Sequence, residues 1–183
     1  MPSSLGHFTI AYIIYKSKNT LSLPALIVGS IISDVDILFY YLIGGSFDIG
    51  REILHSFVGV GLLGTLLSML LTTLFYPRIV SALLGINREE VKRVCSFSKT
   101  TLVSSLIGGF SHVLVDSTCH NYNPLFYPFT RQSIDVLLIT NDWRLSYAIV
   151  EILLLVLLLL MLIIDFSKRK TKGVWKRLLI GYN

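Results

Sequence analysis

The chain alternates between long hydrophobic blocks and short polar segments. Residues 57–76 form a stretch of twenty residues without a charge, and residues 145–164 form another twenty with a single charged residue, Glu151. About 20 apolar residues in a helix cross the ~30 Å hydrocarbon core of a bilayer. The pattern therefore predicts at least two membrane-spanning helices.

Five hydrophobic elements are predicted along the chain, at residues 5–15, 23–43, 52–76, 100–118 and 143–165. Pro24 suits the first turn of the second element, and Gly108-Gly109 permits close helix contact in the fourth. Residues 119–142 are polar and aromatic and are predicted to form an ordered loop. The expected fold is all-α: a polytopic helical membrane protein with about four to five membrane helices in one bundle. All 183 residues are expected to form a single integral-membrane domain.

The overall composition agrees with this interpretation. Hydrophobic residues make up 53% of the chain, charged residues 15%, and the mean hydropathy is +0.70. A typical soluble domain carries about 25% charged residues. The composition therefore argues against a soluble globular enzyme and against a disordered tail.

The distribution of charge predicts how the chain is threaded. Sixteen Lys and Arg against eleven Asp and Glu give a net charge of +5, and eleven of the sixteen cations lie in loop 77–99 and tail 166–183. Cytoplasmic loops carry such an excess, so this loop and this tail are predicted to be cytoplasmic, and loop 119–142 and the N-terminus to face outward. The expected location is the cell membrane, multi-pass, with a cytoplasmic C-terminus. The basic tail can also contact anionic membrane lipids, whereas no motif points to nucleic acid.

The two cysteines give no sign of a disulfide or of a paired-cysteine metal site. Cys95 falls in the basic loop and Cys119 follows the fourth element, which places them on opposite faces of the membrane in this topology. The Cys-x-x-Cys spacing of many metal sites is missing.

The same threading brings all four histidines and three of the aspartates to the outer side. They are His7, Asp34, Asp36, His55, His112, Asp116 and His120. Acids and histidines within membrane segments are costly and by default indicate function. Carboxylates and imidazoles from several helices at one depth are satisfied most simply by a divalent metal. Zinc is the first expectation, with manganese or another first-row ion as alternatives.

Local spacing adds detail to this candidate site. His112 and Asp116 are four residues apart and share one helical face. Asp34 and Asp36 are two apart and do not, so either the helix is irregular there or only one of them binds metal. The other would then accept a proton or orient a ligand. Arg51 lies one helical turn before His55, where its guanidinium fork suits a phosphate group.

Simpler interpretations stay open for each residue. His112 with Asp116 is also consistent with a neutral hydrogen-bonded pair, and Asp34 and Asp36 with a structural role. His7 and His120 can be plainly exposed, and Arg51 can extend its head group to the membrane interface. The joint placement of all these groups at one side favours a site.

Five motifs resemble a known family. They are Gly6-His7, residues 29–36, Arg51 through His55-Ser56, residues 109–116 and residues 124–129. Together they resemble the YdjM-like inner-membrane proteins, described as membrane-bound metal-dependent hydrolases. The resemblance adds Ser56 to the candidate catalytic residues. Where the family pattern has Pro, Thr, Thr and Gly, this chain has Ser33, Leu54, Cys119 and Tyr122, and His120 is additional to the pattern.

The resulting hypothesis is a metal-dependent hydrolase whose site opens at the outer leaflet. The predicted metal ligands are His7, Asp34, Asp36, His55, His112 and Asp116; the predicted catalytic residues are Asp36 as general base, Arg51 and Ser56. The expected substrate is a phospholipid or another amphiphile, because the site is predicted to lie at head-group depth. The alternatives are a small metal- or proton-coupled transporter and an inert membrane scaffold.

Overall fold

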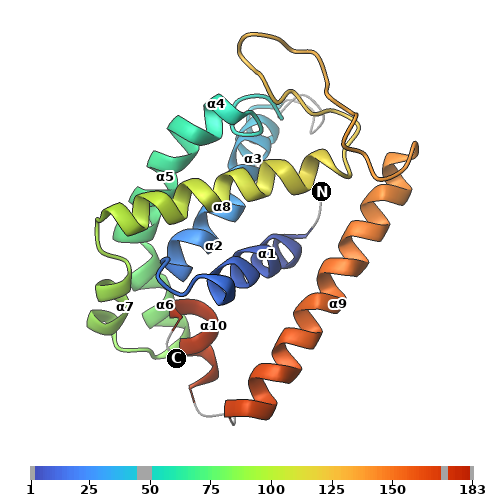
Figure 1. The fold of residues 1–183 in the computed structure, drawn as a ribbon. Helices are drawn as coiled ribbons and strands as arrows, with labels where there is room; N and C mark the ends of the chain where they lie inside the picture. The colour runs from blue at the N-terminus through green and yellow to red at the C-terminus, as the bar shows by residue number, and fades with distance from the viewer. Residues whose placement is uncertain (1–2, 45–50, 170–172, 182–183) are drawn as a thin grey trace.

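The structure, a computed structural model, describes residues 3–44, 51–169 and 173–181. Every regular element in these ranges is helical, which confirms the all-α class (Figure 1). In chain order the elements are α1 Ser4–Ser17, α2 Leu23–Ile32, α3 Asp34–Leu42, α4 Phe57–Gly59, the π-helix η1 Val60–Gly64, α5 Thr65–Leu74, α6 Tyr76–Leu84, α7 Arg88–Val94, α8 Lys99–Ser117, α9 Trp143–Arg169 and α10 Val174–Ile180. Loop 119–142 connects α8 to α9 without a helix or strand.

Among the described residues, two helical stretches are long and apolar enough to cross a membrane. They are Phe57–Leu74, which runs through α4, η1 and α5, and Trp143–Ser167 within α9. A third span results if α2 and α3, which meet at a bend of 43°, are counted as one. Only 11% of the α9 span is buried within the protein, so almost all of this helix is available to lipid.

The expected count of four to five membrane helices is therefore higher than the structure shows. α1 has 14 residues and extends only about 21 Å, less than the ~30 Å hydrocarbon core. α8 is long enough at 19 residues, but its serines, glycines, His112 and Asp116 make it too polar to qualify as a span.

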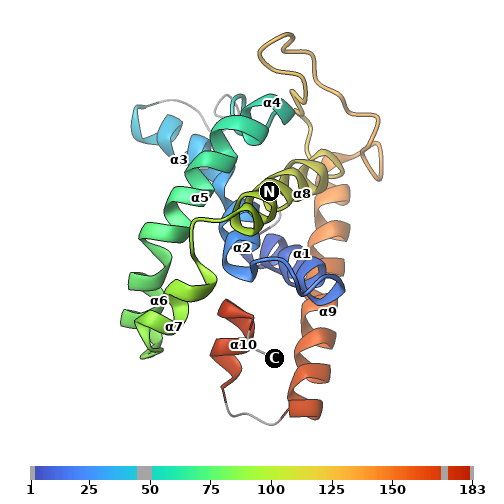
Figure 2. The same ribbon diagram turned by 60° about the vertical axis from the view of Figure 1, so that its left-hand side comes forward.

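The centre of the fold is the crossing of α2 and α8. Figures 1 and 2 show α2 in the middle, with α5 and α9 on opposite sides. Glycines allow the two backbones to touch: a Cβ atom at Gly29 would lie 2.5 Å from the Ser105 carbonyl oxygen, and one at Gly108 would lie 2.5 Å from that of Leu26. The close helix contact predicted at Gly108-Gly109 is confirmed.

The predicted element 23–43 is divided at Ser33 into α2 and α3. The irregular helix, one of the two possibilities for Asp34 and Asp36, is thus what the structure shows. The predicted element 52–76 becomes helical only at Phe57, because the Ser56 hydroxyl accepts a hydrogen bond from the Gly59 N–H and caps the helix.

The basic segments contain helices that the hydrophobic pattern did not predict. Loop 77–99 holds most of α6 and all of α7, and tail 166–183 holds the end of α9 and α10. Of that tail, residues 170–172 and 182–183 lie outside the described residues, and so do its cations Lys170 and Lys172.

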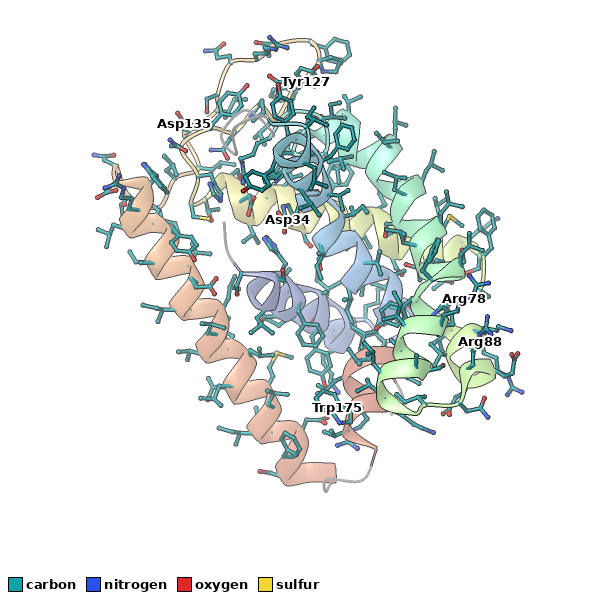
Figure 3. The ribbon with its side chains drawn as sticks, turned by 180° about the vertical axis from the view of Figure 1, so that it is seen from behind. Asp34, Arg78, Arg88, Tyr127, Asp135 and Trp175 are labelled. Atoms are coloured by element: carbon teal, nitrogen blue, oxygen red, sulfur yellow. The ribbon has the colours of Figure 1, made fainter. Side chains whose placement is uncertain are left out.

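One end of the molecule carries the basic segments and the other carries loop 119–142. α10 folds back onto the bundle, where Asp165 of α9 lies 2.9 Å from Arg177 and 3.4 Å from Lys16 of α1. Figure 3 shows Tyr127 and Asp135 of loop 119–142 at one end of the protein, and Trp175 of α10 towards the other. The basic segments and loop 119–142 thus lie at different ends of the described protein.

Candidate metal centre

Side chains from four segments meet beside the α2–α8 crossing. Figure 3 shows one of them, Asp34, nearer to Tyr127 and Asp135 of loop 119–142 than to Trp175 of α10. α1 contributes His7, α3 contributes Asp34 and Asp36, segment 51–56 contributes Arg51 and His55, and α8 contributes His112 and Asp116. All the residues proposed as metal ligands from the sequence are thus brought together. His7, His55, His112 and Asp116 are at least 98% buried, which excludes an exposed role for His7.

Four ligand atoms surround one point. His112 Nε2 lies 3.4 Å from Asp116 Oδ2, 3.4 Å from His55 Nε2 and 3.6 Å from Asp34 Oδ1. His55 Nε2 lies 3.6 Å from Asp116 Oδ2. Ligands at 2.0–2.1 Å around a tetrahedral zinc ion are separated by about 3.3 Å. The spacings among His55, His112 and Asp116 are close to this value, so these groups could hold a divalent cation, with Asp34 beside His112.

The nitrogens that face away from this point are held by partners of their own. His112 Nδ1 lies 2.8 Å from the Ser30 carbonyl oxygen, which can only accept, so Nδ1 donates and carries the proton. His55 Nδ1 lies 3.1 Å from Asp36 Oδ1. Such partners fix the ring orientation of metal-binding histidines and leave the opposite nitrogen free to bind. Both Nε2 atoms are therefore aimed at the same point.

Several atoms at the centre lack a hydrogen-bond partner among the described residues. They are His7 Nε2, Asp34 Oδ1 and Asp116 Oδ1. His7 Nε2 and Asp116 Oδ1 face each other at 3.4 Å. Buried polar groups without a partner are costly, and a bound divalent cation would be a partner for lone pairs of this kind. The donor set thus fits a divalent metal better than it fits a closed hydrogen-bond network.

Arg51 supplies a buried positive charge beside the acidic groups. Its Nη2 donates to Asp116 Oδ2 at 2.6 Å, while Nε and Nη1 have no hydrogen-bond partner in the described part of the chain. A guanidinium keeps its charge in proteins, so these donors are available to an anionic group. Ser56 is placed differently: its hydroxyl donates to the Ile53 carbonyl and accepts from the Gly59 N–H. Both contacts are to backbone and cap a helix.

Two residues outside the predicted ligand set also reach this region. His120 is buried, not exposed in its loop, and its Nε2 lies 3.9 Å from Asp116 Oδ2. Cys119 is fully buried beside it. Burial lowers the pKa of His120 to about 3 and raises that of Cys119 to about 12. The four-residue spacing of His120 from Asp116 is the sequence feature from which this contact could have been predicted.

A family model described as YdjM inner membrane protein matches residues 3–180 of this chain. The chain belongs to the YdjM inner membrane protein family. Comparisons with curated proteins and with solved structures found no match. Membership agrees with the apolar helices, so this is an inner-membrane protein; the family description itself states no activity.

In this YdjM family member, α3 forms the most exposed edge of the centre. The side chains of Asp34 and Asp36 are 20% and 14% exposed, compared with 2% or less for the three histidines and the aspartate that face them. The neighbouring α3 residues Val35, Leu38 and Phe39 are exposed hydrophobics. A molecule that approaches the ligands along this edge therefore meets apolar side chains first.

Proposed function

We propose that this chain is a membrane-bound metal-dependent hydrolase that cleaves an ester or phosphoester of a lipid-like substrate. The observation that carries the proposal is the cluster of Asp34, His55, His112 and Asp116, with ligand atoms at metal-binding distances and free Arg51 donors beside it. His7 supplies a further ligand, because its Nε2 lies 3.4 Å from Asp116 Oδ1. Zinc suits this nitrogen and oxygen donor set, as do other first-row ions.

A divalent cation held there would lower the pKa of a bound water towards ~7 and polarise the substrate oxygen. The protein's own groups have separate tasks. Asp36 contacts His55 and the Leu54 N–H, and orients that histidine. It is also, with Asp34, one of the two partly exposed carboxylates at the edge of the cluster, where it can accept a proton from water. Ser56 serves the local fold through its capping contacts.

Arg51 is the group best placed to hold an anionic substrate. Arg51 Nη2 binds Asp116, and the other two nitrogens, Nε and Nη1, lack a hydrogen-bond partner among the described residues. Charge-assisted hydrogen bonds from a guanidinium to phosphate are short, strong and often bidentate. This favours a phosphoester over a neutral carboxylic ester.

The proposed substrate class follows from the edge at which the ligands are exposed. Asp34 and Asp36 open beside Val35, Leu38 and Phe39, all of which are more than 40% exposed. In a membrane protein such residues face lipid chains, so a substrate with an apolar tail and a polar head suits this edge. By the charge rule, the centre faces outward and the C-terminus is cytoplasmic.

The test is hydrolysis by the purified full chain in lipid nanodiscs, after removal of any affinity tag. Expected results are release of product from phospholipid or phosphodiester probes, loss of turnover with a chelator, and recovery with zinc. His112→Ala and Asp116→Ala should each lose turnover by about 100-fold or more, since both supply metal ligands. Asp142→Asn, an exposed carboxylate of loop 119–142, is the matched control and should retain it.

Arg51→Gln separates substrate binding from metal binding. Loss of hydrogen bonds from a charged donor predicts a fall of roughly 10–100-fold in kcat/KM for anionic probes, with metal content unchanged. Turnover that survives chelation, or that is normal in His112→Ala, would overturn the proposal. Bound metal without turnover on any amphiphilic probe would overturn it in favour of a transporter.

A further inference from the structure

A second group of metal-type ligands lies at the end of α8, beside the first. It consists of Asp116, Cys119 and His120, and one ligand atom from each lies within 4.8 Å of the other two. Asp116 is shared with the centre described above, whereas Cys119 and His120 belong to the first residues after α8. Neither cysteine nor this histidine has a task in the proposed function.

His120 is the strongest member of this group. The residue is only 7% exposed, and its Nε2 has no hydrogen-bond partner among the described residues. This nitrogen lies 3.9 Å from Asp116 Oδ2, and the His120 carbonyl accepts a hydrogen bond from the Asn123 side chain at 2.7 Å, which holds the loop in place. A buried imidazole nitrogen is thus directed at a carboxylate but too distant to bond to it.

Cys119 completes the donor set. It is fully buried, and its sulfur makes one weak contact of 3.6 Å with the Val115 carbonyl oxygen. Thiolate, imidazole and carboxylate are all established zinc ligands. A thiolate also favours soft ions such as zinc and disfavours manganese and magnesium.

We propose that Asp116, Cys119 and His120 bind a second divalent cation, with Asp116 bridging it to the first. The inference rests on the proposed function, since it adds a second ion to the same centre. A pair of metal ions about 3.5–4 Å apart is common in hydrolases, where it clamps the attacking and leaving oxygens of a phosphoester. Asp116 Oδ2 is the oxygen that faces both groups, 3.4 Å from His112 Nε2 and 3.9 Å from His120 Nε2.

Cobalt(II) provides a readout that does not depend on activity. A cysteine thiolate bound to cobalt(II) gives a sulfur-to-metal charge-transfer band in the near ultraviolet, whereas nitrogen and oxygen ligands alone do not. The tag-free full chain would be depleted of metal, reloaded with cobalt(II), and measured for bound equivalents and for this band. The result expected for the wild type is two equivalents per chain and a clear band.

Cys95 makes a matched control possible. It is buried among Val80, Ile86 and Val91 in the cluster around α6 and α7, remote in the fold from the centre. Cys119→Ser should lose the band and one cobalt equivalent, and Cys95→Ser should keep both. His120→Ala should also lose one equivalent, which keeps the test decisive if Cys119→Ser fails to fold. Circular dichroism would verify that each variant is folded.

The outcomes separate the two proposals. One equivalent and no band in the wild type would overturn the second site and leave the first centre standing. A band that survives in Cys119→Ser, or disappears in Cys95→Ser, would also overturn the second site. No bound cobalt at all would overturn the proposed function as well.

Discussion

The hydrogen-bond partners of the two Nδ1 atoms, on His55 and His112, fix how these histidines are oriented in the centre. His112 donates from Nδ1 to the Ser30 carbonyl, and His55 Nδ1 faces Asp36. A free imidazole exchanges its proton between two nitrogens and rotates about two bonds. These partners remove that freedom before any ligand arrives, so the Nε2 atoms stand ready 3.4 Å apart.

We predict that Asp36→Ala weakens cobalt binding without abolishing it. Removing such an outer partner of a metal-binding histidine typically costs about 10–100-fold in affinity. Asp36→Asn, which keeps an oxygen to accept from His55, should recover part of the loss. The measurement is a competition titration with a chelator, with Glu89→Ala at the far end of the protein as the control. An unchanged affinity in Asp36→Ala would remove Asp36 from the centre.

Residue spacing predicted some of these contacts and had no means to predict others. His112 and Asp116 share a face because a helix repeats every 3.6 residues, and the structure places them 3.4 Å apart. The Ser30 carbonyl is a backbone group, which no side-chain pattern shows. His120 was open to interpretation as a loop residue because its burial depends on tertiary packing.

At the scale of the helices, one crossing positions most of the centre. The touching backbones of α2 and α8 at Gly29 and Gly108 bring Ser30 within hydrogen-bonding distance of His112. The bend at Ser33 then starts α3, which carries both of its aspartates in its first turn. The close packing at Gly29 and Gly108 therefore determines how His112 is oriented in the centre.

We predict that Gly108→Ala destabilises the fold and loosens the centre. The new Cβ would lie 2.5 Å from the Leu26 carbonyl oxygen, a backbone atom that cannot rotate away. Overpacking of this kind costs typically about 1–3 kcal/mol, and the helices must separate to relieve it. Thermal unfolding in detergent should show a lower Tm, together with weaker cobalt binding.

Gly61→Ala is the matched control for that variant. The nearest atom to its added Cβ would be 3.6 Å away, in the Phe110 ring, an ordinary van der Waals contact. Its Tm should stay close to that of the wild type. Equal Tm values for the two variants would contradict the close-packing account.

The hydrophobic pattern predicted α8 to within one residue at each end, and α9 began where expected. It missed α6, α7 and α10, because these short helices are stabilised by packing at the basic end and not by long apolar runs. α7 does have a helix-start signal in its sequence: Asn87 caps the helix, and Glu89 and Glu90 occupy its first turn. The π-helix η1 has no comparable sequence feature.

At the scale of the whole molecule, the basic segments and the candidate metal centre lie at opposite ends. The centre lies near loop 119–142, whereas α10 and the basic segments pack at the other end (Figure 3). α1 and α9 run parallel to each other. The Ser3 N–H donates to Glu151 near the start of α1, and Lys16 near its end pairs with Asp165. If the basic end is cytoplasmic, both helices run towards the cytoplasmic side.

We predict that single cysteines introduced at the two ends react differently in intact cells. Gln132→Cys in loop 119–142 and Glu89→Cys in α7 replace exposed residues, and the native Cys95 and Cys119 are buried. A membrane-impermeant maleimide should label Gln132→Cys directly and Glu89→Cys only after permeabilisation. The reverse pattern would place the centre at the cytoplasmic face.

The most direct test of the central claim is the metal content of the purified, tag-free chain, measured by elemental analysis after reconstitution with zinc and gel filtration. Asp116 lies beside His55 and His112 in the first centre and also belongs to the group with Cys119 and His120, so its removal affects both proposed ions. The account predicts at least one zinc per chain in the wild type and none in Asp116→Ala that is still folded. A wild-type chain that holds no metal, or an Asp116→Ala variant that holds as much as the wild type, would contradict it.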